Sequence, residues 1–197
     1  MIAIFDYGAG NLQSVQNTLA EIGATYTLTH DSDGLRAASK IILPGVGHFG
    51  QMMRALDTLQ VRETLLERIA AGVPFLGICL GLQALLTESE EAPEATGLGL
   101  YPGTVRRFPL DARVPHMGWN QLEPKSPSKL LVKLPPQPYV YFAHSYYVPE
   151  NSATAARCTY TAPYTAVLED RNVFGVQFHP EKSGPVGLQI VRNFLEI

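Results

Sequence analysis

A cysteine stands where the chain changes from a strand pattern to a helix pattern. Residues 73–79 are mostly apolar, and Gly-Ile-Cys-Leu-Gly at residues 77–81 leads into good helix formers. This pattern predicts a buried strand, a tight turn and a helix start. A cysteine in such a turn meets the free N–H groups and positive dipole end of the helix, which favour its thiolate. Cys79 is thus a candidate nucleophile on an elbow. The alternative is inert packing, because free cysteine is among the most buried residue types.

A histidine and a glutamate near the end of the chain are suited to activate that thiol. His179 directly follows the strand pattern of residues 173–178, and Glu181 stands two residues further on. In an extended segment these two side chains point the same way, so the carboxylate can hold the imidazole tautomer. Cys79, His179 and Glu181 then form a candidate catalytic triad for acyl transfer. The alternative is a solvated surface turn after a strand.

Acyl transfer also needs N–H donors for the oxyanion. The elbow supplies one donor, the N–H of Leu80. We expect the second from Pro-Gly-Val-Gly at residues 44–47, where Val46 and Gly47 are the candidates. The glycines permit unusual backbone angles that can turn an N–H into the site. An ordinary turn that ends a strand is the alternative.

The elements that position these residues alternate in the first half of the chain. We expect strands at 2–5, 25–28 and 40–43, helices at 12–22, 49–56 and 61–71, a turn at 31–34 and a short connection at 35–39. Asn11 is the expected N-cap of the first helix. Such alternation is typical of a parallel sheet wrapped by helices, whose ligands bind beyond the carboxyl ends of the strands. The turns at 6–11, 44–47 and 77–81 should therefore crowd one edge.

Short strand patterns dominate after residue 90. We expect strands at 101–108, 120–122, 139–142, 155–160, 165–169 and 173–178, and a last helix at 186–195. Sequential short strands favour antiparallel additions to the parallel sheet. The predicted fold class is α/β, a single domain over residues 1–197. It has a central mixed, mostly parallel sheet flanked by helices, with an antiparallel β extension in the second half.

Composition argues against several classes of protein. A net charge of -3 gives no reason to expect nucleic acid or an acidic membrane as partner. The two cysteines, Cys79 and Cys158, are too few for a disulfide framework, so a reducing cytoplasm is expected and Cys158 is interpreted as packing. No apolar run approaches the ~20 residues of a membrane span, and the N-terminus has no basic segment typical of a signal peptide. No Cys/His pairs have metal-ligand spacing, and Gly8-x-Gly10 lacks the rest of a dinucleotide fingerprint, so we expect no metal and no cofactor.

Together these motifs resemble the triad-type (class I) glutamine amidotransferases. Four further segments narrow the resemblance to the glutaminase subunits of imidazole glycerol phosphate synthase: Asp-Tyr-Gly-Ala-Gly-Asn at 6–11, Pro-Gly-Val-Gly-His-Phe-Gly at 44–50, His-Met-Gly-Trp-Asn at 116–120 and His-Ser-Tyr at 144–146. The match covers essentially the whole chain. It implies that Cys79 attacks the side-chain amide of glutamine, which releases ammonia and leaves a thioester that water hydrolyses to glutamate.

The resemblance also implies a substrate site and a partner. The substrate-binding residues would be Gly45, Gly47, Gln83, His144, Ser145 and Tyr146. Gln83 also fits on spacing, because it lies one helical turn beyond Cys79. The ammonia would pass to a (β/α)8 cyclase subunit in a heterodimer that makes imidazole glycerol phosphate and an aminoimidazole carboxamide ribotide in histidine biosynthesis. The partner interface would contain Asn11, Met117, Trp119, Asn120 and Lys182.

Several alternatives stay open. Trp119 could be buried core rather than an interface anchor, and Lys182 could be a solvated lysine. The chain could serve another pathway, such as pyridoxal phosphate, anthranilate or purine synthesis. It could also be a stand-alone cysteine hydrolase acting on γ-glutamyl or peptide bonds, or a catalytically dead scaffold.

The loop at residues 44–47 suggests a hypothesis about regulation. Val46 is β-branched and lies between two glycines, so its peptide can flip toward or away from the oxyanion. We hypothesise that the free subunit is nearly idle until the cyclase and its substrate align this peptide.

Overall fold

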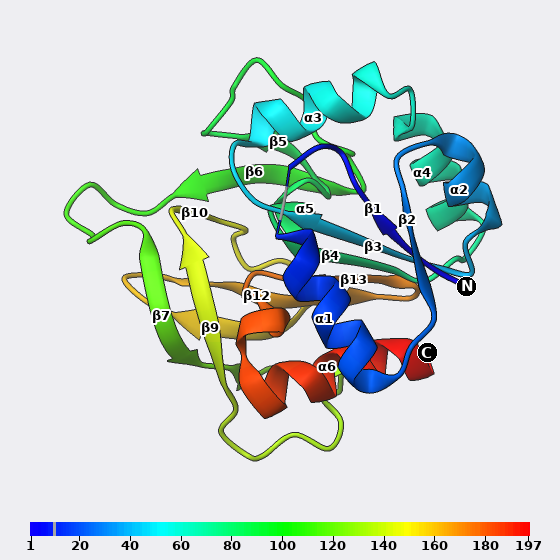
Figure 1. The fold of residues 1–197 in the computed structure, drawn as a ribbon. Coiled ribbons are helices and arrows are strands. Elements are labelled where there is room, and N and C mark those ends of the chain that lie inside the picture. Colours follow the sequence, from blue (N-terminus) through cyan, green and yellow to red (C-terminus); the bar gives the residue numbers. More distant parts are fainter. Residues whose placement is uncertain (10) are drawn as a thin grey trace.

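A central sheet organises the computed structural model, which describes residues 1–9 and 11–197. Its strand order is β2-β1-β3-β4-β13-β12-β11-β8 (Figure 1). The parallel strands are β2 (Tyr26–Thr29), β1 (Ile2–Phe5), β3 (Lys40–Gly45), β4 (Phe75–Cys79) and β13 (Val173–Val176). The antiparallel extension is β12 (Pro163–Asp170), β11 (Thr154–Thr159) and β8 (Glu123–Pro124). The predicted α/β class is confirmed.

A late strand enters the middle of this sheet. β13 pairs in parallel with β4, and Gly175 lies opposite Gly77 while Val176 lies opposite Ile78. The residues that follow β13 therefore emerge at the same sheet edge as Cys79, which ends β4. This pairing brings Gln177 and Cys79, 98 positions apart in sequence, into contact.

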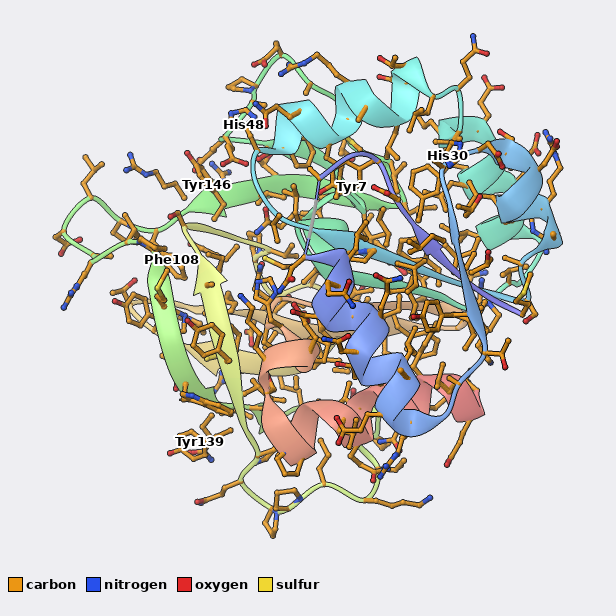
Figure 2. The ribbon with its side chains drawn as sticks, in the orientation of Figure 1. Tyr7, His30, His48, Phe108, Tyr139 and Tyr146 are labelled. Atoms are coloured by element: carbon orange, nitrogen blue, oxygen red, sulfur yellow. The ribbon has the colours of Figure 1, made fainter. Side chains whose placement is uncertain are left out.

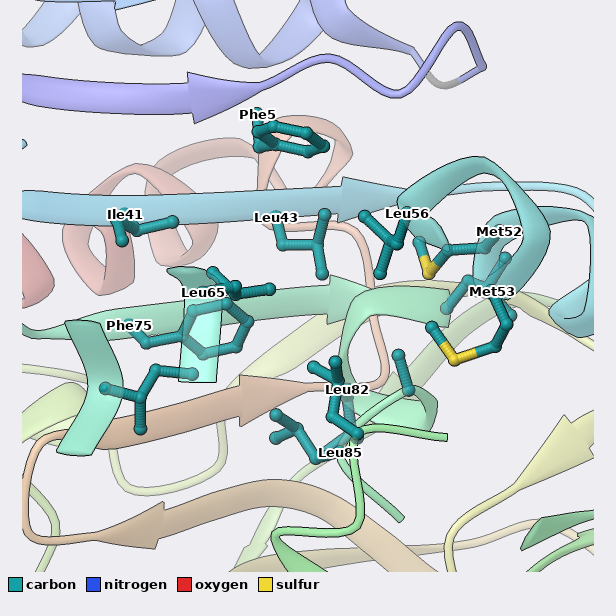
Figure 3. Close-up of a cluster of buried hydrophobic side chains, with 14 of the residues drawn as sticks. Phe5, Ile41, Leu43, Met52, Met53, Leu56, Leu65, Phe75, Leu82 and Leu85 are labelled. Carbon is teal, nitrogen blue, oxygen red and sulfur yellow. The ribbon is translucent and has the colours of Figure 1, made fainter. Parts of the chain in front are cut away.

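Helices cover both faces of the sheet (Figure 1). One face carries α1 (Leu12–Ile22) and α6 (Gly184–Glu196), which pack against each other. The other carries α2 (Ser32–Ala37), α3 (Phe49–Thr58) and α4 (Arg62–Ala70). Because both faces are covered, the central strands are continuous apolar runs, and β1 and β4 are buried throughout. Figure 3 shows the core between the sheet and α3, α4 and α5.

Two smaller sheets flank the central one. One contains β10 (Tyr146–Tyr147), β6 (Tyr101–Arg107) and β5 (Leu86–Ser89), and the other pairs β7 (His116–Gln121) with β9 (Tyr139–His144). Short 3-10 helices, η1 (Lys129–Leu131) and η2 (Pro180–Lys182), complete the fold. The sequence pattern does not predict β5, and its pairing with β6 is parallel rather than antiparallel.

Local expectations differ from the structure at three places. The turn and connection expected over residues 31–39 contain α2, because the Asp31 carboxylate accepts a hydrogen bond from the Gly34 N–H (2.8 Å) and caps a helix. Asn11 occupies the predicted N-cap position of α1, although its side chain makes no capping hydrogen bond. The helix after Cys79, α5 (Leu80–Gln83), has only 4 residues. Within the described residues, no helix combines the length and apolar character needed to cross a bilayer.

Candidate active site

Cys79 lies on a strained turn between β4 and α5. Its backbone angles are φ 53 and ψ -104, in a region that non-glycine residues rarely adopt. The buried strand on one side and α5 on the other hold this conformation, which is that of a nucleophile elbow. The N–H of Leu80 opens α5 and therefore has no acceptor within the helix. It is available to an oxyanion that forms beside the Cys79 sulfur.

The end of β3 packs directly against the elbow. The sheet register places Gly45 opposite Cys79, so residues 46 and 47 continue beside the thiol. A Cβ at Gly45 would lie 2.8 Å from the Gly81 nitrogen, and one at Gly81 would overlap the Leu43 carbonyl oxygen. Glycine at these two positions is what lets the two backbones approach so closely.

His179 and Glu181 complete the expected constellation. His179 Nδ1 lies 2.8 Å from Glu181 Oε1, and the two side chains are only 4% and 3% exposed. Burial alone would lower the pKa of His179, but hydrogen bonds to Cys79 and Glu181, together with their negative charge, raise it overall. The His179 backbone is also fixed: its N–H donates to the Tyr141 carbonyl (2.9 Å), and its carbonyl accepts from the Ser183 hydroxyl (2.7 Å). The imidazole therefore stands between a thiol and a carboxylate, as base catalysis requires.

A pocket of about 200 Å³ opens over the Cys79 sulfur. It is lined by Val46, Gly47, Cys79, Leu80, Gln83, Glu91, Pro115, Ala143, His144, Ser145 and Tyr146. The structure thus gathers most of the predicted substrate-binding residues around the thiol. Gly45 does not line the pocket and lies behind it, against the elbow.

Buried hydrogen bonds brace one wall of the pocket. The Gln83 side-chain amide donates to the Tyr146 carbonyl (2.8 Å), which also lies 2.8 Å from His144 Nδ1. His144 Nε2 lies 3.3 Å from both His116 Nδ1 and the Tyr164 hydroxyl. Burial lowers the pKa of His144 to about 3 and that of His116 to about 4, so both imidazoles are neutral. These residues are therefore suited to shape the wall rather than to exchange protons.

Sequence reasoning missed two polar residues of the site. The Gln177 amide donates to the Cys79 sulfur (3.6 Å), and its carbonyl accepts from Gln83 (3.2 Å). Its position two residues before His179, on the same side of an extended segment, was a usable signal. Glu91 is the one acidic side chain in the pocket lining, and it accepts from the Phe49 N–H (2.7 Å). No spacing in the sequence connects Glu91 to Cys79.

Val46 makes a contact that the sequence does not suggest. Its N–H donates to the Tyr7 hydroxyl (3.2 Å), and the same hydroxyl lies 3.2 Å from the Val46 carbonyl, to which it can donate. Tyr7 is the second residue after the end of β1 (Figure 2). The turn at residues 6–11 therefore reaches the loop at 44–47, as expected from their places at one sheet edge. Gly10, within that turn, lies outside the described residues.

The predicted interface residues lie partly on one exposed face. Met117 and Trp119, on β7, are 64% and 56% exposed, so the buried-core interpretation of Trp119 is wrong. The Trp119 ring packs edge-on against Tyr141 (6.1 Å), and the Lys182 ammonium lies 6.0 Å from the Tyr141 ring. Asn120 instead donates to the Thr159 carbonyl (3.1 Å), and Asn11 lies half-buried at the start of α1. We call Met117, Trp119, Tyr141 and Lys182 the Trp119 face.

The described residues contain no group of three or more His, Cys, Asp or Glu side chains placed to hold a metal ion. The polar groups of the pocket instead suit a small molecule that carries both charge and a carbonyl. The base, the thiol and the free N–H of Leu80 can act on that carbonyl.

Comparisons with known proteins point the same way. Residues 3–197 match the family model described as glutamine amidotransferase class-I. A protein from Methanothermobacter thermautotrophicus, "Imidazole glycerol phosphate synthase subunit HisH", is 52% identical over 100% of this chain and 98% of its own length. The protein of the same name from Desulfitobacterium hafniense is 46% identical over 98% of this chain and 93% of its own.

Solved structures share the fold at low sequence identity. One described as "Crystal structure of glutamine amidotransferase" superposes with a TM-score of 0.78 at 18% identity, covering 99% of this chain and 97% of that one. The "Structure of PurLQS from Thermotoga maritima" gives a TM-score of 0.75 at 17% identity, with the same coverage.

Proposed function

Because this chain belongs to the class-I glutamine amidotransferases, and within them to the glutaminase subunits of imidazole glycerol phosphate synthase, we propose that Cys79, His179 and Glu181 carry its glutamine hydrolysis. The enzyme hydrolyses glutamine to glutamate and ammonia for histidine biosynthesis. The observation that carries the residue assignment is the buried His179–Glu181 pair (2.8 Å) together with the raised pKa of His179, to which interaction with Cys79 contributes.

The first half of the reaction forms a thioester. The Cys79 thiolate adds to the side-chain carbonyl carbon of glutamine, while the proton it gave up resides on His179. The raised pKa of His179 favours this imidazolium, and Glu181 stabilises it. The tetrahedral intermediate collapses as His179 protonates the departing nitrogen. Ammonia leaves, and the glutamyl group remains on sulfur.

The second half restores the thiol. His179, now neutral, takes a proton from water as that water adds to the thioester carbonyl, and then returns a proton to the sulfur as glutamate leaves. Both halves pass through an oxyanion. We assign the Leu80 N–H as a donor that is always directed at this oxyanion. The Val46 and Gly47 N–H groups are donors only when the loop at residues 44–47 turns them toward it.

Glu91 is suited to recognise the other end of the substrate. Free glutamine carries an α-ammonium group, and Glu91 is the one acidic side chain among the residues that line the pocket. Charge-assisted hydrogen bonds of this kind are roughly twice as strong as neutral ones. The neutral wall formed by His144, Ser145 and Tyr146 would position the rest of the amino acid.

The ammonia needs a second subunit. We propose that a cyclase subunit of imidazole glycerol phosphate synthase docks on the Trp119 face, with the complex located in the cytoplasm. Exposed aromatic side chains of this kind are enriched at interface hot spots. The Tyr141 carbonyl accepts the His179 N–H, so this surface is joined directly to the triad backbone.

A mixing experiment tests the function and the assignment together. The chain and the cyclase should convert glutamine to ammonia and imidazole glycerol phosphate, and Cys79→Ser should lower glutamine-dependent turnover by more than about 10³-fold. The same variant complex supplied with ammonium should still make product, because the cyclase site is untouched. Glutamine-dependent turnover by Cys79→Ser near the wild-type rate would refute the nucleophile assignment. The chain could instead support glutamine-dependent synthesis with the synthase subunit of another pathway and not with this cyclase. That result would favour the alternative that the chain serves another pathway.

A further inference from the structure

Gln177 is a buried polar residue to which the proposed mechanism gives no role. None of its surface is exposed, and its backbone N–H donates to the Ala166 carbonyl of β12 (2.9 Å), which continues the sheet beyond the end of β13. An amide withdrawn from water costs free energy unless it is hydrogen-bonded. An apolar side chain would fill this place more easily, so the partners of the amide must explain why it is there.

Two side-chain amides connect the Cys79 sulfur to a backbone carbonyl. The Gln83 NH2 group donates to the Tyr146 carbonyl (2.8 Å) and to the Gln177 side-chain carbonyl (3.2 Å). The Gln177 NH2 group in turn donates to the Cys79 sulfur (3.6 Å). The thiol that we propose as nucleophile is therefore joined to the pocket wall through two consecutive hydrogen-bonded side chains.

The close packing of α5 on β13 brings the two amides together. Gly175 lies under α5, and a Cβ at this position would lie 2.5 Å from the Leu82 side chain. Because glycine leaves this space free, α5 can lie directly on the strand that precedes Gln177. Gln83, the residue after Leu82, then reaches the Gln177 carbonyl.

The Tyr146 end of this relay determines which atom of Gln177 faces the sulfur. A backbone carbonyl only accepts hydrogen bonds, so the Tyr146 oxygen requires the NH2 group of Gln83, and both hydrogens of that group are used. If the Gln177 amide were turned the other way, two NH2 groups would face each other. Its carbonyl must therefore face Gln83, and an N–H donor is left for Cys79.

An N–H donor acts differently on the two protonation states of the thiol. A thiolate accepts a charge-assisted hydrogen bond, which is roughly twice as strong as a neutral one. The sulfur of a neutral thiol is only a weak acceptor, and its proton has the Ala143 carbonyl as a distant partner (4.0 Å). Hydrogen bonding to the charged form favours that form, so the Gln177 amide stabilises the thiolate in addition to His179.

We propose that Gln177 is a catalytic residue whose side-chain N–H stabilises the Cys79 thiolate, in an orientation that the Tyr146 carbonyl fixes through Gln83. The inference rests on the proposed function of Cys79 and deepens it. The thiolate is held by His179 on one side and by a neutral amide on another. The amide donates whether glutamine is bound or not, and it carries no proton that the reaction must return.

The electrostatic surroundings of the thiol allow this donor to be measured by pH. Gln177 carries no charge, so its substitution changes none of the titratable groups near the sulfur. Among the described residues, these groups are His179, Glu181, His144, Glu91, Tyr7 and Tyr164. A change in the pH dependence of the thiol therefore reports the lost donor.

Gln177→Met tests the assignment, with Gln189→Met as the matched control. Methionine has a similar length, and its thioether still accepts weakly from Gln83, but it donates nothing. Gln189 also bonds another side chain, Asn193 (2.8 Å), on α6 and away from the pocket. The pH of half-maximal alkylation of Cys79 by iodoacetamide should rise by about one unit in Gln177→Met and stay unchanged in Gln189→Met. Mass spectrometry of the peptide that contains the thiol measures the alkylation.

Glutamine hydrolysis by the complex with the cyclase gives a second readout. At pH 7, kcat of Gln177→Met should fall about 10-fold, while KM stays within about 3-fold because Gln177 does not line the pocket. The deficit should narrow as the pH is raised toward 9, because a thiol without its donor still loses its proton at higher pH. A purely structural role would lower the rate by the same factor at every pH.

The outcomes separate this donor from the function itself. An unchanged alkylation midpoint in Gln177→Met, or a loss of rate that is independent of pH, would overturn the assignment. If Gln177→Met does not fold, Gln83→Met decides. It keeps the Gln177 amide but removes the partner that orients it, so the midpoint should rise by a smaller amount, and no rise would also overturn the assignment. Absence of ammonia release by wild type with the cyclase would instead refute the proposed function, whatever the alkylation profile.

Discussion

The buried His179–Glu181 pair shows how single contacts set the chemistry of this site. Desolvation works against a charged imidazole, and two neighbours outweigh it. Glu181 accepts at 2.8 Å, which fixes the ring and leaves the other nitrogen for Cys79. The pairing that we propose to serve catalysis therefore also contributes to the stability of the fold, and the pH dependence of unfolding reveals the sign of that contribution.

Glu181→Gln should weaken both catalysis and the contribution of the His179–Glu181 pair to stability. The pKa of His179 in the folded chain is about 10, above the unfolded value of about 6.5, so its stabilisation is complete below about pH 6.5 and is lost as pH rises toward 10. Glu181→Gln should make this loss of unfolding free energy with pH shallower, and lower kcat by about 10²- to 10⁴-fold. Urea unfolding between pH 6 and 10 measures the slope. Glu94→Gln, in an exposed pair, is the control, and equal slopes in all three proteins would contradict the assignment.

Glu91→Gln should act on binding rather than on the chemical step. The isosteric amide keeps an acceptor for the Phe49 N–H but removes the charge that we propose to bind the substrate ammonium. We expect KM for glutamine to rise about 10-fold with kcat changed by less than about 3-fold. Glu90→Gln is a matched control, because the neighbouring carboxylate pairs with Arg106 outside the pocket. Steady-state kinetics in which both variants behave alike would remove Glu91 from the site.

At the scale of elements, the site depends on three chain segments that meet at the carboxyl ends of β3, β4 and β13. The closest approach is between β3 and α5, where Gly45 and Gly81 leave no room for a side chain. The elbow is strained at Cys79, so this contact holds a conformation that the chain would otherwise leave. Packing at the elbow should therefore control both stability and activity.

Gly81→Ala should destabilise the fold by about 2–3 kcal/mol, because the new methyl group overlaps the Leu43 carbonyl, which cannot move without breaking the sheet. Gly72→Ala is a useful comparison. Gly72 has φ +87 but open space around it, so only conformational strain of roughly 1 kcal/mol is expected. Thermal or urea unfolding compares the two, and ammonia release should fall only in Gly81→Ala. A smaller loss of stability in Gly81→Ala than in Gly72→Ala would contradict this account.

Local patterns in the sequence predict many elements but not their long-range contacts. β1 and α1 match their predicted ranges, and α6 extends the predicted helix by a residue or two at each end. Residues 31–39 were misassigned because the capping carboxylate of Asp31 outweighs the turn signals around it. The bond between Tyr7 and Val46 depends on how two loops meet, and the position of Glu91 depends on how the turn after β5 meets the start of α3. Short-range periodicity carries no information about either.

At the scale of the molecule, the proposed triad lies between the pocket and the exposed Trp119 face. The pocket proposed to bind glutamine lies on one side of Cys79 and His179, and the Trp119 face continues from Tyr141 on the other. Figure 2 shows Tyr139 at the start of β9 and Tyr146, in β10, beyond its other end; β9 itself runs from Tyr139 through Tyr141 of the Trp119 face to His144 of the pocket wall. Docking on β7 and β9 is therefore well placed to affect the site.

Trp119→Ala should weaken partner binding without weakening the fold. The ring is 56% exposed, so its removal costs little in the free chain, whereas loss of an interface anchor raises Kd by roughly 30-fold or more. Leu28→Ala is the control, because Leu28 is 43% exposed on the distant edge strand β2. Titration of the cyclase against each variant measures Kd. Equal affinities would place the partner elsewhere.

The position of β13 between β4 and β12 has a consequence for protein synthesis. While the chain emerges from the ribosome, Cys79, the proposed nucleophile, is made long before His179, its proposed base, and β4 must wait with one edge unpaired until residue 176 is translated. The nascent polypeptide therefore cannot consume glutamine before it is nearly finished. The cost is an apolar strand edge exposed during that interval, which is a site where chaperones are expected to bind.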